Sequence, residues 1–343
     1  MKTLLALDSF KGCLTAPEAV DAAASALAER DVCRLPLSDG GEGFAECLAG
    51  CLGGVFRTAP VHDPLGRPIQ ACYALLEGGR IAVIETAAAS GLTLLKSKEL
   101  NPLTASSVGT GELMQDAVGQ GVQEIWIGLG GTAVMDCGAG LLEALAPLPA
   151  GVRVHAFYDV DVPLTGPSGA PAVFGPQKGA DTAGVTLLEQ RFREQAEAWK
   201  KAYGMDPDAV PGAGAAGGIG AALALCLGAE MHAGIGAVLE AVRFPERLSG
   251  CGLVITGEGK ADCQTLTGKV PYGVLQATRR YAPEVPVVLL AGKVEDREKL
   301  LSAGFDAVIQ VTPEESLNSN YLEKSVAREN LRRAVQDLPY LRD

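Results

Sequence analysis

The first stretch of the chain decides the fold: Thr3-Leu-Leu-Ala-Leu-Asp-Ser9, followed at Thr15-Ala-Pro-Glu18 by a helix start. The apolar run ends at an acidic residue and a hydroxyl, which is typical of the carboxyl end of a buried strand. The Thr15 hydroxyl and the Glu18 carboxylate can each satisfy a free backbone amide, as in a capping box. We therefore predict a strand followed directly by a helix.

The same order recurs in two places. The apolar run Val32–Leu37 precedes the turn Ser38-Asp-Gly-Gly-Glu-Gly43 and a further helical stretch. After residue 250 we expect strands at 251–256, 285–290 and 307–311, helices at 271–281 and 296–303, and a C-terminal helix through Leu317, Tyr321, Leu331 and Val335. Strands that alternate with helices indicate a parallel sheet.

The middle of the chain has a different pattern. Val55–Val61, Pro68–Leu76 and Arg80–Glu85 resemble strands joined by short turns, which favours antiparallel pairing. Further strands are expected at 124–127 and 152–160, and a helix capped by Thr186 follows. We predict an α/β protein of two domains. Residues 1–55 plus 246–343 form a parallel-sheet, Rossmann/flavodoxin-like domain, and residues 56–245 form an inserted mixed α/β domain.

Composition and charge narrow the class of partner. The 343 residues carry a formal net charge of −12, and no basic tract is present that could displace counterions from nucleic acid. The longest uncharged apolar run, 217–229, is too short to span a bilayer. Nine cysteines without a CxxC spacing fit free thiols in a reducing compartment. We expect a cytoplasmic protein that binds a small molecule, not nucleic acid or a membrane.

Glycine-rich loops are the main functional signal. Glycine lets the backbone approach an anion closely, and the helix N-terminus behind such a loop offers free amides. One loop alone is usually a tight turn, but several at the carboxyl ends of parallel strands indicate a phosphate site. The loops are residues 8–12, 38–43, 128–140, 211–218 and 256–262.

Two of these loops also match the dinucleotide-binding fingerprint formally. They are Gly128-x-Gly130-x-x-Ala133 and Gly212-x-Gly214-x-x-Gly217. Neither is followed by the acidic residue that would bind a ribose hydroxyl, and the GxxxxGK[ST] phosphate loop is absent. A nicotinamide-dependent oxidoreductase therefore stays open only as an alternative.

Charged residues in the same loops supply the groups that phosphoryl transfer requires. Candidate phosphate contacts are Lys11, Lys178 and Lys260, and candidate metal ligands or bases are Asp8, Asp39, Asp159, Glu258 and Asp262. Each lysine could equally be a solvated surface charge, and each acid could be a turn or helix cap. His62, His155 and His232 share no motif, so we expect them to be structural.

Taken together, the motifs resemble the bacterial glycerate kinases of the glycerate 2-kinase type. The matching segments are Asp8–Gly12, Asp39–Gly43, Thr86–Leu92, Gly109–Leu113, Phe174–Ala180, Pro211–Gly218, Ile255–Lys260 and Gly268–Val274. The resemblance runs from residue 1 to about 312. It implies two α/β domains with the active site in the cleft, ATP with Mg²⁺ as phosphate donor, glycerate as acceptor and 2-phosphoglycerate as product.

The loops and the resemblance together give a set of expected site residues. We expect Asp39, Asp159 and Lys11 to be catalytic, with Asp39 as the base that takes the hydroxyl proton, and Glu258 and Asp262 to bind the metal. The expected substrate and phosphate contacts are Asp8, Ser9, Ser90, Thr110, Gly130, Gly131, Thr132, Asp136, Lys178, Gly214, Gly217 and Lys260.

The chain departs from the family pattern at three positions. Val108 replaces the usual Arg before Gly-Thr-Gly-Glu-Leu, Met135 replaces an Asn, and Tyr158 replaces a Cys. We expect these changes to affect the identity of the acceptor more than the use of ATP. A kinase for another small hydroxy acid therefore stays open beside glycerate kinase.

Overall fold

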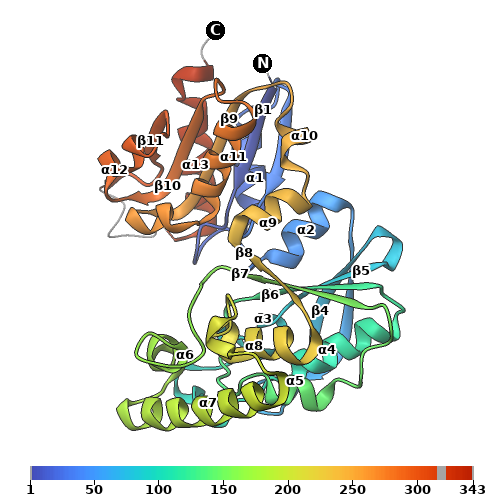
Figure 1. Cartoon of the computed structure of the whole chain (residues 1–343). Helices are drawn as coiled ribbons and strands as arrows, with labels where there is room; N and C mark the ends of the chain where they lie inside the picture. The colour runs from blue at the N-terminus through green and yellow to red at the C-terminus, as the bar shows by residue number, and fades with distance from the viewer. Residues whose placement is uncertain (1, 315–321, 342–343) are drawn as a thin grey trace. The chain divides into compact units, whose positions relative to one another are not determined.

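The computed structural model describes residues 2–314 and 322–341 (Figure 1). The chain divides into two compact units. Unit 1 consists of Met1–Asp39, Glu46–Cys51 and Ile235–Asp343, and unit 2 consists of Gly40–Ala45 and Leu52–Gly234. The predicted helical positions Leu317 and Tyr321 lie outside the described residues.

The sheet of unit 1 has five strands in the order β11-β10-β9-β1-β2, and every adjacent pair is parallel. Its strands are β1 (Lys2–Leu7), β2 (Val32–Pro36), β9 (Cys251–Ala261), β10 (Val287–Val294) and β11 (Ala307–Gln310). The parallel sheet predicted from the alternation of strands and helices is confirmed. Parallel strands end at one common edge, so the residues after β1, β2 and β9 are brought together there.

Seven helices belong wholly or partly to the described residues of unit 1. They are α1 (Ala16–Ser25), α2 (Phe44–Leu52, of which Glu46–Cys51 are in this unit), α9 (Gly234–Ala241), α10 (Phe244–Leu248), α11 (Val270–Tyr281), α12 (Arg297–Ser302) and α13 (Lys324–Gln336). The predicted capping box at Thr15 is present, because the Thr15 amide donates to Glu18 Oε2 over 3.0 Å. Helices α1 and α13 share one apolar core with the strands.

The sheet of unit 2 has six strands in the order β3-β4-β5-β6-β7-β8. They are β3 (Val55–His62), β4 (Pro68–Leu76), β5 (Ile81–Glu85), β6 (Glu124–Leu129), β7 (Arg153–Tyr158) and β8 (Glu230–Ala233). The pairs β3–β4 and β4–β5 are antiparallel, and the others are parallel. The mixed sheet is as predicted, but the short edge strand β8 was not expected.

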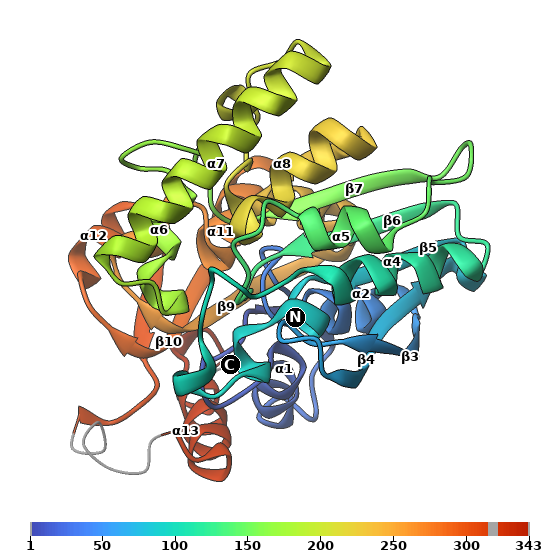
Figure 2. The same cartoon turned by 90° about the horizontal axis from the view of Figure 1, so that it is seen from below.

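Helices of unit 2 cover one face of this sheet. They include α3 (Ala87–Ser90), α4 (Val108–Gly119), α5 (Ala139–Ala144) and α8 (Ala215–Leu227), and Figure 2 shows α4 and α5 side by side. Their buried side chains, such as Leu113, Leu141 and Ile219, pack with Ile125, Ile127 and Ala156 of the sheet. Alternate strand residues, including His155 and Phe157, point to the other face.

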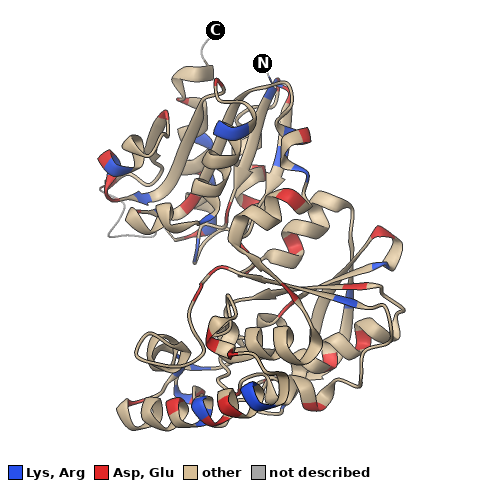
Figure 3. Cartoon of the chain, in the orientation of Figure 1, with Lys and Arg blue, Asp and Glu red and all other residues tan. Residues whose placement is uncertain are grey.

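Helix α7 (Thr182–Tyr203) packs beside α6 (Ala170–Phe174) through a narrow apolar stripe that includes Leu188, Phe192 and Trp199. Its other sides carry interspersed acidic and basic residues (Figure 3). The prediction that Thr186 caps this helix is wrong, because Asp181 is the cap, five residues earlier, and its side chain accepts the Gly184 amide. None of the described helices combines the length and apolarity of a membrane span.

Candidate active site

Three carboxylates gather at the carboxyl edge of the unit 1 sheet. Asp8 follows β1, Asp39 comes shortly after β2, and Glu258 lies near the end of β9. The order β9-β1-β2 makes these strands neighbours, and the Asp8 amide donates to the Gly257 carbonyl over 3.0 Å. The sequence predicted each of these residues singly, and the sheet topology brings them together.

The negative charges in this cluster disfavour one another. Burial, the carboxylate of Asp39 and, to a lesser degree, that of Glu258 raise the pKa of Asp8 to about 8, although the Ser9 amide donates to Asp8 Oδ1 over 2.6 Å. Burial also raises the pKa of Glu258, which is only 4% exposed. A cluster of this kind retains protons at neutral pH unless a cation balances its charge.

Glu258 and Asp262 lie in different surroundings. Thr265 Oγ1 donates to Glu258 Oε1 over 2.6 Å, and Lys269 Nζ lies 3.6 Å from Glu258 Oε2. Asp262 instead caps the short 3-10 helix η6 (Cys263–Thr267), where its side chain accepts the Gln264 amide. The structure therefore gives Asp262 a capping role and leaves Glu258 as the member of this predicted pair that lies near Asp8.

The two predicted lysines of unit 1 are exposed. Lys260 Nζ lies 3.2 Å from Asp262 and 3.0 Å from Glu295, so it forms ion pairs with these two carboxylates. Lys11 lies in the loop after β1, and its backbone runs close to Gly259.

In unit 2 the two long glycine loops pack against each other. Gly217 has a positive φ of 70°, and a Cβ on it would stand 2.0 Å from the Val134 carbonyl oxygen. A Cβ on Gly130 would stand 2.9 Å from the Cα of Gly41. Only glycine allows these approaches, so the loop 128–140 packs closely against the loop 211–218 at Gly217 and against the loop 38–43 at Gly130.

Lys178 lies at the centre of this arrangement. It ends the short 3-10 helix η4 (Pro176–Lys178), and its Nζ donates to Thr132 Oγ1 over 3.1 Å and to the Val134 carbonyl over 2.8 Å. Burial lowers the pKa of Lys178 to about 7, although the charge of Asp136 acts in the opposite direction. A pocket of about 140 Å³ adjoins it, lined in part by Gly130, Gly131, Asp159 and Gln177. A buried, weakly neutralised ammonium group beside glycine amides is suited to bind an anion.

Asp136, Ser90 and Thr110 organise the loops around this pocket. Asp136 accepts hydrogen bonds from Ser107 and from the amides of Gly138 and Gly140, which start α5. Ser90 Oγ and Thr110 Oγ1 are 2.7 Å apart and buried. Their contacts are internal to the protein, so these three predicted site residues serve first to hold the loops in place.

The remaining predicted residues and the departures from the family pattern lie nearby. Gly214 is buried, and a Cβ on it would meet the Pro163 carbonyl. Tyr158 fills the space beside Gly212, and Met135 is buried in the core around α7. Val108 is the first residue of α4.

Sequence reasoning missed three groups that the structure adds to these sites. Thr265 and Lys269 are partners of Glu258, and Thr86 Oγ1 bonds to the carbonyls of Gly128 and Gly130. A single Thr or Lys residue does not by its type indicate a functional site. Thr86 and Lys269 lie inside the segments 86–92 and 268–274, which the resemblance singled out, whereas Thr265 lies outside every such segment and had no indication in the sequence.

The comparisons with known proteins agree over nearly the whole length of the chain. Residues 3–148 and 145–341 match the glycerate kinase family. The chain is 39% identical to a glycerate kinase of Bacillus subtilis, with 91% of each chain covered, and 38% identical to a glycerate 2-kinase of Escherichia coli, with 91% of this chain and 90% of that protein covered.

A solved structure gives the same result. The crystal structure of a Salmonella typhimurium LT2 protein assigned as glycerate kinase 2 superposes with a TM-score of 0.83 at 36% identity, covering 98% of this chain and 96% of the other. The family match favours a kinase over the nicotinamide-dependent oxidoreductase that the glycine fingerprints had left open. The chain belongs to the glycerate kinase family.

Proposed function

We propose that this protein transfers the γ-phosphate of ATP to the C2 hydroxyl of glycerate, giving 2-phosphoglycerate and ADP. The observation that carries the proposal is the relationship to glycerate kinases over nine-tenths of the chain, among them a protein named glycerate 2-kinase. ATP as donor and C2 as the phosphorylated position are part of the proposal. We also propose that the reaction takes place in the cytoplasm, where ATP is available.

The acidic cluster of unit 1 supplies the groups that handle the proton and the metal. Asp39 is the proposed base, which accepts the hydroxyl proton as the glycerate oxygen forms its bond to phosphorus and the bond to ADP breaks. A catalytic carboxylate must be held near its substrate by a rigid scaffold. The end of a parallel strand provides one.

The residues present fit a magnesium ion. Oxygen ligands and one or two carboxylates are what Mg²⁺ uses when it also binds phosphates, and Asp8 and Glu258 are carboxylates whose pKa values are raised chiefly by burial. We assign the metal to Asp8 and Glu258, and a capping role to Asp262. When bound, the ion would neutralise charge on the phosphates.

The pocket beside Lys178 is the proposed anion site of unit 2. Its occupant would be a phosphate or carboxylate group of a substrate, because an anion restores the charge that burial removes from Lys178. The glycine amides of residues 130 and 131 add donors without a side chain in the way.

The decisive experiment measures ADP release with ATP, Mg²⁺ and a panel of small hydroxy acids. Glycerate should give the highest kcat/KM. A preference for another hydroxy acid would support the alternative of a related kinase and would point to Val108, Met135 and Tyr158. Proton-coupled phosphorus NMR then identifies the product, because a phosphate on C2 couples to one proton and gives a doublet, whereas one on C3 couples to two and gives a triplet.

A further inference from the structure

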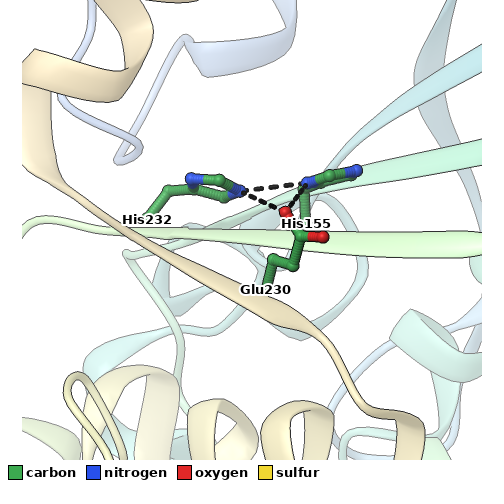
Figure 4. Close-up of side chains that lie close together, drawn as sticks. All are labelled: His155, Glu230 and His232. Atoms are coloured by element: carbon green, nitrogen blue, oxygen red, sulfur yellow. Dashed lines mark hydrogen bonds and ion pairs between the residues drawn. The ribbon is translucent and has the colours of Figure 1, made fainter.

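Three side chains converge on the edge strand β8 of the unit 2 sheet and on its neighbour β7. His155 pairs directly with Glu230, and Phe157 pairs with His232, so His155, Glu230 and His232 project from the same face. Figure 4 shows the two imidazoles and the carboxylate pointing toward one another. Nothing in the proposed kinase reaction uses these residues.

The distances in this cluster match those of ligands around one metal ion. His155 Nδ1 lies 3.0 Å from His232 Nε2 and 3.4 Å from Glu230 Oε2, and His232 Nε2 lies 3.9 Å from the same oxygen. Zn²⁺ takes its ligands at about 2.0–2.2 Å in a tetrahedron, which places ligand atoms roughly 3.3–3.5 Å apart. The three measured separations bracket that range.

We propose that His155, Glu230 and His232 form a site for a divalent transition-metal ion, with Zn²⁺ as the best fit. Two imidazole nitrogens and one carboxylate oxygen are a zinc ligand set that leaves a fourth position for water. Magnesium prefers oxygen ligands and octahedral geometry, so this site discriminates against the ion proposed for the acidic cluster of unit 1. The side chains of His232 and Glu230 are 31% and 65% exposed, so an ion can enter from solvent.

The surroundings of His155 support the assignment. Its second nitrogen, Nε2, is buried without a hydrogen bond to the described residues and lies 3.8 Å from Glu124 Oε2. A carboxylate beside the far nitrogen of a metal-bound histidine favours the tautomer in which the near nitrogen is free to bind. Glu124 is held by Arg80, whose Nη1 lies 2.9 Å from Oε1, and by the Trp126 indole, which donates to Oε2 over 3.0 Å.

The site connects an edge strand to the rest of its sheet. β8 has only four residues, and unit 2 ends at Gly234 directly after it. An ion shared by β7 and β8 would cross-link the two strands and stabilise their pairing. This role is independent of the proposed glycerate kinase reaction and holds whether or not that proposal is correct.

The test is a binding titration with Co²⁺ and Zn²⁺ in the presence of excess Mg²⁺, which saturates oxygen-rich sites. Trp126 reports binding, because its ring lies 6.3 Å from that of His155, and Trp199→Phe leaves it as the single tryptophan. The exposed thiols Cys72 and Cys263 are changed to Ser to remove competing ligands. We expect quenching of Trp126 by Co²⁺, a tetrahedral Co²⁺ spectrum, and reversal of both by Zn²⁺.

Three variants decide the outcome. His232→Ala should weaken binding more than 100-fold, and Glu124→Gln, which acts only through His155, by about 10–100-fold. His62→Gln is the matched control, because His62 is also paired with a carboxylate, Glu112, but has no second imidazole beside it. Equal affinity in His232→Ala and the unmodified protein, or no saturable Co²⁺ binding at all, would overturn the proposal.

Discussion

The two units bury charge of opposite sign. The site in unit 1 has an excess of negative charge, and the site in unit 2 contains a buried positive group. In unit 1 burial, and after it the carboxylates of Asp39 and Glu258, raise the pKa of Asp8 to about 8. In unit 2 Lys178 donates to two neutral oxygens, and burial lowers its pKa to about 7 although the charge of Asp136 acts in the opposite direction. The comparison indicates that the first site accepts a cation and the second an anion.

The largest expected effect tests the acidic site. Asp39→Asn keeps the size and capping ability of the side chain but cannot take a proton. If Asp39 is the base, kcat falls by about 10²–10⁴-fold without a fall in the melting temperature, because the change also removes a charge that repels Asp8. The measurement is steady-state ADP release beside thermal unfolding. A stable variant with normal kcat would leave Asp39 only a role in the turn.

The matching change in the basic site is Lys178→Met. It removes the proposed anion contact, so kcat/KM should drop by about 10–100-fold, the value of a hydrogen bond to a charged group. Stability should not decrease, because the buried ammonium group is replaced by an apolar chain of similar length. Lys200→Met, which changes an exposed lysine of α7, is the control and should behave as the unmodified protein.

The pKa of Asp8 is raised and that of Lys178 is lowered, so the two sites should change the stability of the protein with pH in opposite directions. The folded chain keeps the Asp8 proton up to about pH 8, whereas an ordinary Asp releases it near 3.8, so this site loses stability as pH rises through that window. Lys178 gives up its proton near pH 7 in the folded chain and near 10.5 otherwise, so its site gains stability as pH rises from 7 to 10.5.

Melting temperatures measured against pH check both signs. Asp8→Asn should flatten the loss between pH 4 and 8, and Lys178→Met should flatten the gain above pH 7. Mg²⁺ should raise the melting temperature of the unmodified protein more at pH 8 than at pH 5, because it competes with the Asp8 proton. An equal effect of Mg²⁺ at both pH values would argue against Asp8 as a ligand.

Two variants, at Glu258 and at Asp262, test which of these acids binds the metal. Glu258→Gln should raise the Mg²⁺ concentration for half-maximal activity by about 10-fold, since a carboxylate ligand becomes a neutral amide. Asp262→Asn retains an oxygen for the Gln264 amide and should leave the Mg²⁺ requirement unchanged. A larger shift for Asp262 than for Glu258 would reverse the assignment.

Much of the fold could be predicted because local signals agreed with the tertiary structure. The capping box at Thr15 and the apolar runs of β1 and β9 are strong patterns that burial reinforces. Strand β8 was missed because Glu230-Met-His-Ala233 has neither the length nor the β-branched residues of a strand, and it pairs only because β7 offers a free edge. The start of α7 was misplaced because Asp181 competes with Thr186 as a cap.

The sequence predicted which types of residue occupy the candidate sites, but not which of them lie next to one another. Asp8, Asp39 and Lys178 stand beside glycine at predicted loop positions, so their chemistry was visible in the sequence. The interaction of Asp8 with Glu258 joins residues 250 positions apart and depends on β1 lying next to β9. The convergence of His155 with His232 depends likewise on the unexpected strand β8. Such pairs arise from sheet order, which no local pattern encodes.

The smallest expected effects come from two threonines that support the opposite charges. Thr265 donates to Glu258, and Thr132 accepts from Lys178. Replacing either by Val removes one hydrogen bond at nearly constant volume. Each charged group keeps a second partner, Lys269 or the Val134 carbonyl, so each change should cost only about 1 kcal/mol of stability.

The direction of the pH effect distinguishes these two variants. Thr265→Val withdraws a donor from the Glu258 carboxylate, whose pKa burial raises, so its cost should become smaller as the pH falls and the carboxylate takes up a proton. Thr132→Val withdraws an acceptor from an ammonium group, so its cost should be larger at pH 6 than at pH 9. Urea unfolding as a function of pH measures both. If the two variants lost stability in the same direction with pH, the charges assigned to the two sites would not be the groups that the threonines support.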